Sequence, residues 1–269
     1  MPTKIIVCGA AGRMGRTLIT LITQTDGAQL VGATEAADNA TLGKDAGEVA
    51  GVGTLGVRIT DDYAALATPD TVALDFTNAT AALEHLRAAV QQHSAIVIGS
   101  TGFTPAQQAE LDTLAPQTRS VIASNMSVGI TVLLRLVRQA ALALGPEFDP
   151  EIVEMHHKLK IDAPSGTALS LGRAVTGATG RDFASDPVYG REGVIGQRQP
   201  KEIGILALRG GDVVGDHTVI FAGMGERIEL THRAQSRDCL ARGGIRAALW
   251  LVGQPVARYT MADVLGLKN

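Results

Sequence analysis

The feature that most constrains the fold is a glycine-punctuated turn that follows a short apolar run near the start of the chain. Ile5-Ile6-Val7-Cys8 is continuously apolar, which is typical of a strand covered on both faces. The turn begins at Gly9 and leads into a stretch with helical periodicity from about 13 to 25. This succession of strand, turn and helix predicts an open α/β sheet.

The rest of the first half alternates between strand-like and helix-like stretches. Apolar runs lie at 29–34, 72–74, 95–98 and 121–123, and helical stretches are expected between them, near 80–92 and 104–114. Strands that alternate with helices predict right-handed crossovers and a parallel sheet of Rossmann type. The segment 36–55 is rich in glycine, alanine and aspartate and is expected to be a long surface loop.

From about Ser127 the pattern changes. A helix is expected from there to about Leu144, and one further helix starts near Ser165. Four strand-like stretches surround that second helix, at 151–157, 203–209, 215–222 and 226–234. Because strands outnumber helices, this part is expected to be an α+β domain on a mixed or antiparallel sheet.

The domain boundaries follow from this change of pattern. Residues 1–127 are expected to form the first domain and 128–236 an inserted second domain. An apolar helix at about 238–251 is expected to pack back on the first domain, so that 237–269 rejoins it. The interval 178–201 has no periodicity and is expected to be a mobile or substrate-covering loop.

Composition excludes several classes of protein. The net charge of −3 gives no electrostatic reason to expect binding to nucleic acid. No uninterrupted run of about eighteen apolar residues is present, and the N-terminal apolar run is too short for a signal peptide. Two cysteines, Cys8 and Cys239, are too few for a disulfide framework. We therefore expect a cytoplasmic globular protein without membrane or nucleic-acid partners.

The glycine turn, in its context, predicts a dinucleotide site. The start of the following helix offers free N–H groups to a pyrophosphate, and Glu35 closes the second strand where a carboxylate can bind the ribose hydroxyls. The alternative is a tight turn with a surface glutamate, since the G-x-x-G-x-x-G spacing is less common than G-x-G-x-x-G. The predicted cofactor residues of the turn are Gly9, Ala10, Ala11, Gly12, Arg13, Met14 and Gly15.

Two more loops follow predicted strands and are expected at the same edge of the sheet. Ligands of open α/β sheets bind at the carboxyl ends of the strands, so both loops are candidates for cofactor contact. The alternative is ordinary turn chemistry, with Ser127 as a helix cap. The loop residues concerned are Gly99, Ser100 and Thr101, followed by Gly102, and Ala123, Ser124, Asn125 and Met126.

The densest polar cluster runs from Glu151 to Thr167. If 151–160 is extended, alternation places His156, Lys158 and Lys160 on one face and His157 on the other. His156 could then donate a proton while Lys160 binds an anion. The alternative is a sheet edge with one buried and one exposed histidine ring.

Further candidate residues lie beside this cluster. Ser165, Gly166 and Thr167 follow Pro164 at an expected helix start, which offers N–H groups and hydroxyls to a carboxylate. Arg209 could pair with a substrate carboxylate or be an ordinary charge at a strand end. No metal site is expected, because neither an H-E-x-x-H pattern nor paired cysteines are present. The other histidines are expected to be structural or solvent-facing: His85, His93, His217 and His232.

On these residues the chain resembles the 4-hydroxy-tetrahydrodipicolinate reductases, also called dihydrodipicolinate reductases, of bacterial lysine and diaminopimelate biosynthesis. The most specific shared element is E-x-H-H-x-x-K-x-D-A-P-S-G-T, from Glu154 to Thr167. The resemblance implies His156 and Lys160 as catalytic residues, with His157, Gly166 and Thr167 at the substrate. It also implies a homotetramer assembled through sheets of the second domain.

The implied reaction is the NAD(P)H-dependent reduction of a cyclic dicarboxylate, 4-hydroxy-tetrahydrodipicolinate, to tetrahydrodipicolinate with loss of water. Some family members carry an arginine after the ribose-binding acid, which suits the 2′-phosphate of NADP. Here Ala36 and Ala37 follow Glu35, so NADH is expected to serve at least as well as NADPH. Many members also have a proline where this chain has Asn78-Ala79, a change expected to alter only a loop.

Two other functions remain open from the sequence. A relative of homoserine or aspartate dehydrogenase would explain the dinucleotide fold but leaves the stretch from His156 to Thr167 unexplained. A dinucleotide-sensing module without enzymatic activity needs no proton donor and would tolerate the loss of His156.

Overall fold

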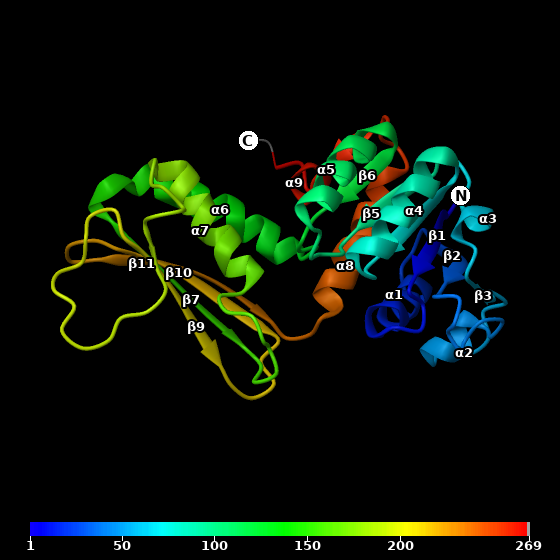
Figure 1. Ribbon diagram of the computed structural model, residues 1–269, viewed down its shortest axis with the longest axis horizontal. Helices are drawn as coiled ribbons and strands as arrows, with labels where there is room; N and C mark the ends of the chain where they lie inside the picture. Colours follow the sequence, from blue (N-terminus) through cyan, green and yellow to red (C-terminus); the bar gives the residue numbers. More distant parts are fainter. Residues whose placement is uncertain (268–269) are drawn as a thin grey trace. The chain divides into compact units, whose positions relative to one another are not determined.

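The computed structural model describes residues 1–267, which divide into two compact units (Figure 1). Unit 1 comprises Met1–Val128 and the segment that starts at Asp238, and unit 2 comprises Gly129–Arg237. The segment 237–269, predicted to rejoin the first domain, includes 268–269, which lie outside the described residues. Each unit is built on a sheet of its own.

Unit 1 contains a seven-stranded sheet in the order β12-β6-β5-β4-β1-β2-β3, and every pairing in it is parallel. The strand order reverses between β1 and β4, as in doubly wound nucleotide-binding folds. This confirms the predicted Rossmann-type sheet. The strands are β1 (Thr3–Cys8), β2 (Ala28–Thr34), β3 (Ile59–Thr60), β4 (Thr71–Asp75), β5 (Ala95–Ile98), β6 (Arg119–Ile122) and β12 (Ala257–Tyr259).

Helices cover both faces of this sheet (Figure 1). On one face α1 (Arg13–Thr23) and α8 (Asp238–Leu251) share a core with Ile5 and Val7 of β1. On the other face α4 (Ala79–Gln91) and α5 (Pro105–Leu114) share a core with Ile6 and Cys8. Successive side chains of a strand point to opposite faces, so two covered faces explain the unbroken apolar run of β1.

The segment 36–55 contains a helix, so the expectation of one long surface loop is wrong for its second half. The helix α2 (Ala46–Ala50) starts after Asp45, whose carboxylate accepts hydrogen bonds from five backbone amides between Gly47 and Val57. Such short elements have too few residues to show a period. The other short helices and strands of unit 1 that the sequence analysis did not predict are β3, α3 (Tyr63–Leu66), η1 (Ala115–Gln117), β12 and α9 (Met261–Val264).

Unit 2 contains a five-stranded sheet in the order β11-β10-β7-β9-β8. Its central strand, β7 (Asp149–His156), is antiparallel to β10 and parallel to β9, so the sheet is mixed, as predicted. The helices α6 (Val128–Leu144) and α7 (Gly166–Thr179) share a core with one face of this sheet. The remaining elements are η2 (Gly145–Glu147), β8 (Pro187–Val188), β9 (Ile203–Arg209), β10 (Gly215–Ala222) and β11 (Arg227–Ala234).

Helix α6 and the turn that follows it, Val128–Glu147, are long and apolar enough to cross a bilayer by length and composition alone. Arg135 and Arg138 interrupt this apolar stretch in its middle. Ile130, Leu133 and Val137 are buried in the core of unit 2. The apolar character of α6 therefore has a role within unit 2, because one of its faces is part of that core.

Candidate functional site

The glycine turn after β1 has the geometry of a tight strand-to-helix connection. Gly9 adopts a φ of 71°, which favours glycine. A Cβ atom on Gly15 would lie 2.0 Å from the carbonyl oxygen of Gly9, so only glycine lets α1 approach the turn this closely. Gly12 is the N-cap of α1, and among the described residues no side chain caps it. The first N–H groups of the helix are thus available to an anion.

Glu35 follows β2 and reaches back to this turn. Its Oε1 atom accepts a hydrogen bond of 2.8 Å from Ala11 N, and Oε2 accepts bonds of 3.2 Å from Ala36 N and Asn39 Nδ2. A carboxylate offers about four acceptor positions, so three of them are used by the protein itself. Two ribose hydroxyls would therefore have to displace one of the present donors.

The two other predicted loops follow β5 and β6 at the carboxyl ends of the parallel strands. Ser100 is buried and donates to Asp75 Oδ1 at 2.8 Å, and Ala123 N donates to Ile98 O at 3.2 Å. Met126 is 1 % exposed and belongs to the core of unit 1. Met126 therefore presents almost no surface to a ligand, whereas Thr101 is exposed.

These features fit a dinucleotide. The uncapped N-terminus of α1 suits a pyrophosphate, and the close approach at Gly15 leaves the turn free of side-chain bulk. Glu35 stands at the end of β2, where the ribose of a dinucleotide is bound in folds of this type. Unit 1 therefore has helix N–H donors for a pyrophosphate and a carboxylate at the end of β2 for a ribose.

The polar centre of unit 2 is the carboxylate of Glu154 on β7, which has no exposed surface. Arg209 of β9 donates to both of its oxygens, at 2.9 and 3.0 Å, and His156 Nδ1 lies 2.6 Å from Oε2. Ser165 N donates to Oε1 at 2.9 Å. Burial acts to raise the pKa of Glu154, but the hydrogen bonds from Arg209, His156 and Ser165 outweigh it and hold the pKa below its usual value. Glu154 is thus ionised and accepts from each of these partners.

His217 of β10 belongs to the same group, so of the two alternatives expected for it, structural or solvent-facing, the second is wrong. It is 3 % exposed, its ring packs edge-on against that of His156 with centroids 5.1 Å apart, and its Nε2 lies 3.1 Å from Ser165 Oγ. Burial, with a further contribution from His156, lowers the pKa of His217 to about 4. His217 is therefore a neutral ring beside the start of α7.

Ser165 is the N-cap of α7, as predicted. Its Oγ atom accepts a hydrogen bond of 3.2 Å from Ala168 N, and Gly166 and Thr167 form the first helical positions after it. Gly166 is exposed and Thr167 is half-buried. The start of α7 is thus fixed from two sides, by its own cap and by the bond from Ser165 N to Glu154.

The predicted alternation of His156, Lys158 and Lys160 is wrong beyond His156, because β7 ends there. The chain then turns, with a hydrogen bond of 3.0 Å from Lys160 N to His157 O. The ammonium group of Lys160 lies 2.9 Å from Asp162 and lowers the pKa of that carboxyl. Lys158 is exposed, and His157 Nε2 lies 3.4 Å from Arg237 Nη2.

Three residues of these sites have contacts that the sequence pattern did not single out. Asp75 comes directly after a predicted strand run, so the rule that ligands meet strand ends could have drawn attention to it. Glu154 begins the motif quoted above, but a buried carboxylate beside a histidine is visible only in three dimensions. His217 lies 61 positions after His156, and antiparallel pairing of β7 with β10 brings them together.

Comparisons with known proteins agree on one family. The family described as dihydrodipicolinate reductase, N-terminus, matches residues 3–126, and the one described as dihydrodipicolinate reductase, C-terminus, matches 129–265. Proteins named 4-hydroxy-tetrahydrodipicolinate reductase are 52% identical in Syntrophotalea carbinolica, over 98% of this chain and 99% of that protein, and 52% identical in Anaeromyxobacter dehalogenans, over 99% of each.

Solved structures share the fold at lower identity. A dipicolinate-bound dihydrodipicolinate reductase from Paenisporosarcina sp. TG-14 has a TM-score of 0.76 and 22% identity, over 98% of this chain and 99% of that chain. An amine dehydrogenase from Mycobacterium smegmatis has a TM-score of 0.62 and 16% identity, over 97% and 95%. From the family matches and the identities over nearly its whole length, this chain belongs to the dihydrodipicolinate reductase family.

Proposed function

We propose that this chain is a 4-hydroxy-tetrahydrodipicolinate reductase. It uses NADH or NADPH to reduce 4-hydroxy-tetrahydrodipicolinate to tetrahydrodipicolinate, with release of water, in lysine and diaminopimelate biosynthesis. The observation that carries this proposal is the pairing of buried Glu154 with His156 beside the capped start of α7. This pair places a ring that can donate a proton beside a helix N-terminus suited to a carboxylate. Relatives of the chain are named 4-hydroxy-tetrahydrodipicolinate reductase.

The cofactor would be held by unit 1 and would supply the hydride when bound. The N-terminus of α1 would bind the pyrophosphate, and Glu35 would accept from the ribose. Ala36 and Ala37 provide no cation for a 2′-phosphate, which supports NADH as a cofactor at least as good as NADPH. The residues assigned to the cofactor are Gly9, Ala10, Ala11, Gly12, Arg13, Met14, Gly15, Glu35, Gly99, Ser100, Thr101, Ala123, Ser124, Asn125 and Met126.

The substrate carboxylates would be bound in unit 2. The N-terminus of α7, with Ser165, Gly166 and Thr167, offers N–H groups and the positive end of the helix dipole to one carboxylate. Lys160 is only 2.9 Å from Asp162, so it would exchange that partner for the substrate. Arg209 is bound at both Nη atoms to Glu154, so its role as a direct substrate ligand would require the same exchange.

His156 would act as the proton donor. Because ionised Glu154 only accepts hydrogen bonds, Nδ1 of His156 must carry the proton between them, which leaves Nε2 to face the substrate. When both ring nitrogens carry protons, Nε2 can donate its proton to negative charge that develops on the substrate during hydride transfer. His157 would contribute to substrate binding rather than to proton transfer.

We also propose a homotetramer that assembles through the sheets of unit 2, as the family resemblance implies, and residence in the cytoplasm. The two free cysteines, Cys8 and Cys239, are compatible with a reducing compartment. Sedimentation of the purified protein would give its mass in solution. A monomer at micromolar concentration would contradict the assembly without affecting the proposed reaction.

The decisive experiment supplies the purified protein with NADH and enzymatically generated 4-hydroxy-tetrahydrodipicolinate and follows the absorbance of the reduced nicotinamide. We expect NADH oxidation that depends on this substrate. A relative of homoserine or aspartate dehydrogenase would oxidise NADH only with its own carbonyl substrate. A dinucleotide-sensing protein would bind NADH without turnover, and either result would contradict the proposal.

A further inference from the structure

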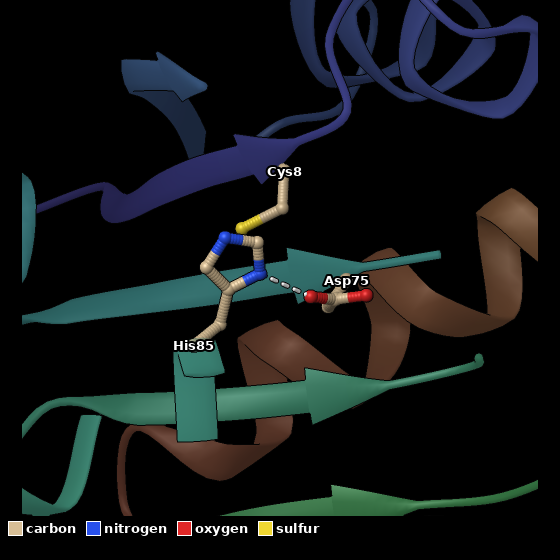
Figure 2. Close-up of side chains that lie close together, drawn as sticks. All are labelled: Cys8, Asp75 and His85. Atoms are coloured by element: carbon tan, nitrogen blue, oxygen red, sulfur yellow. Dashed lines mark hydrogen bonds and ion pairs between the residues drawn. The ribbon is translucent and has the colours of Figure 1, made fainter. Parts of the chain in front are cut away.

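A second polar cluster is buried in unit 1, at the carboxyl ends of β1 and β4 (Figure 2). Cys8 ends β1 and Asp75 ends β4, and the two are paired in the parallel register of these strands. Cys8 is 2 % exposed and Asp75 is fully buried. His85 enters from α4, and Figure 2 shows its ring between the thiol and the carboxylate.

Asp75 and His85 form an ion pair. His85 Nδ1 lies 2.5 Å from Asp75 Oδ2. Burial acts to raise the pKa of Asp75, but the hydrogen bond and charge of His85 outweigh it and lower the pKa. Burial likewise acts to lower the pKa of His85, yet its bonds to Asp75 and Cys8 raise it to about 10. At neutral pH the pair is therefore an imidazolium and a carboxylate.

The other oxygen of Asp75 connects two loops. Oδ1 accepts hydrogen bonds from Thr77 N at 3.0 Å, Thr77 Oγ1 at 2.7 Å and Ser100 Oγ at 2.8 Å. With His85, these donors use about four acceptor positions, the full capacity of an ionised carboxylate. The Asp75 carboxylate thus connects the loop after β4 to the loop after β5 through hydrogen bonds.

Thr77 also lies close to the glycine turn after β1. A Cβ atom on Gly9 would lie 2.9 Å from the methyl group of Thr77, so the position of Thr77 sets the space beside the turn. The loops after β4 and β5 therefore meet around one carboxylate, and Thr77 lies against the turn after β1. In open α/β sheets, these strand ends are where a dinucleotide binds.

A metal ion is the competing interpretation, because ligand atoms of Cys8, Asp75 and His85 all lie within 4.8 Å of one another. However, His85 Nδ1 is bonded to Asp75, which leaves Nε2 and the Cys8 thiol as the pair that could bind zinc without rearrangement. Zinc sites in proteins use about three or four protein ligands. The geometry thus favours a hydrogen-bonded ion pair.

We propose that Asp75 and His85 form a positioning pair that holds the loops after β1, β4 and β5 in the shape required by the dinucleotide. This inference rests on the proposed use of NAD(P)H. Neither residue needs to touch the reacting atoms. His85 keeps Asp75 ionised, and ionised Asp75 orients Thr77 and Ser100.

The test measures NADH dissociation constants by fluorescence titration, below the unfolding temperature of each variant. His85→Ala should raise the dissociation constant about tenfold to hundredfold, the range of one charge-assisted hydrogen bond. His85→Asn keeps an N–H donor near the position of Nδ1 and should recover part of this loss. His93→Asn is the matched control, because His93 is exposed and its φ of 55° is one that asparagine tolerates.

A double-mutant cycle separates positioning from a merely structural role. Ser100→Ala and His85→Ala should have non-additive effects on NADH binding, because both act through Asp75. Additive effects of Ser100→Ala and His85→Ala on NADH binding would overturn the proposal.

Three further results would each count against the proposal, for different reasons. One zinc ion per wild-type chain, measured by mass spectrometry and lost in His85→Ala, would assign the cluster to metal binding instead. Wild-type protein that binds neither NADH nor NADPH would refute the proposed function itself. Normal binding in the wild type and in His85→Ala would refute only the positioning pair.

Discussion

The Nδ1 atom of His156 lies 2.6 Å from a carboxylate oxygen of Glu154, a side chain without exposed surface. Arg209 holds the same carboxylate through both Nη atoms, so Glu154 cannot turn away from the ring. The orientation and the protonated nitrogen of His156 are thereby fixed from the side opposite to Nε2. A group that fixes the general acid in this way should be needed for turnover but not for cofactor binding.

Glu154→Gln should therefore lower kcat by on the order of 10²-fold or more, within the range that general acid catalysis contributes. The amide can present an N–H group to His156 and leaves Arg209 without its counter-ion, so the ring loses its fixed tautomer. Steady-state kinetics with both substrates measure this effect. The NADH dissociation constant should stay unchanged, because the proposed cofactor residues lie in unit 1.

Glu147→Gln is the control for Glu154→Gln, since Glu147 is an exposed carboxylate of the same unit. It should leave both constants unchanged. If Glu154→Gln keeps wild-type kcat while remaining folded by circular dichroism, Glu154 does not position His156.

Glu35→Ala should weaken NADH binding by about 1–3 kcal/mol, the range of a charge-assisted hydrogen bond. NADPH should lose less, because the carboxylate repels a 2′-phosphate. Calorimetric titration with both cofactors measures the difference. Equal losses would indicate that Glu35 acts only through its bond to Ala11 N, which shapes the turn for either cofactor.

NADH should serve the wild-type enzyme at least as well as NADPH. Arg13 is exposed in the first turn of α1 and is the candidate partner for a 2′-phosphate, whereas Arg16 already donates to Ala11 O at 2.9 Å. Arg13→Ala should accordingly lower kcat/KM for NADPH and leave that for NADH unchanged. A wild-type preference for NADPH of about tenfold, or 1.4 kcal/mol, would contradict this expectation.

Stability should fall as the pH decreases from about 6.5 to about 4, in part because of His217. Its pKa is about 4 in the folded chain and near 6.5 when unfolded, so in this window the unfolded state binds a proton that the folded state does not. The loss should reach up to about 3 kcal/mol and level off at lower pH. Urea unfolding at pH 7 and pH 4.5 measures it.

His217→Gln should reduce this pH dependence, because glutamine has no proton to gain yet can still bond Ser165. His93→Asn provides the reference for an exposed histidine of the other unit. If the two variants lose the same amount of stability between the two pH values as the wild type does, protonation of His217 is not coupled to unfolding.

The larger elements of the fold could be predicted because each leaves a periodic pattern. The run Ile5 to Cys8 indicated a strand covered on both faces, and the helices of both units began and ended near their predicted limits. The short helix α2 and the strand β12 could not be predicted. The first is created by the carboxylate of Asp45, and the second by pairing with β6 across more than a hundred residues.

The segments that form the candidate sites could be predicted from the sequence, but the hydrogen bonds that connect those segments could not. The glycine turn and Ser165 as a helix cap follow from local chemistry, which the sequence contains. Glu154 with Arg209 depends on which strands are neighbours, and Asp75 with His85 depends on how α4 packs beside β4, so a local pattern cannot indicate them. The alternation beyond His156 failed because a turn, rather than a strand, carries Lys160.

The division of labour between His156 and Lys160 gives the most discriminating prediction. His156→Ala should lower kcat by on the order of 10²–10⁴, the usual contribution of a general acid, with a much smaller change in the KM of the dicarboxylate. Lys160→Ala should raise that KM and lower kcat together, since an anchor that also stabilises developing charge acts in both the ground state and the transition state. His157→Ala should have a milder catalytic defect and a binding defect.

All three variants should bind NADH as the wild type does, because they lie in unit 2 and the proposed cofactor residues lie in unit 1. Lys158→Ala is the control, since Lys158 is an exposed cation of the same turn. If His156→Ala retains most of its turnover, the Glu154–His156 pair is structural, and the proton must come from Lys160 or from solvent. If NADH affinity falls in step with turnover, the substitution has disturbed folding or the two sites are not independent, and the proposed separation of roles is wrong.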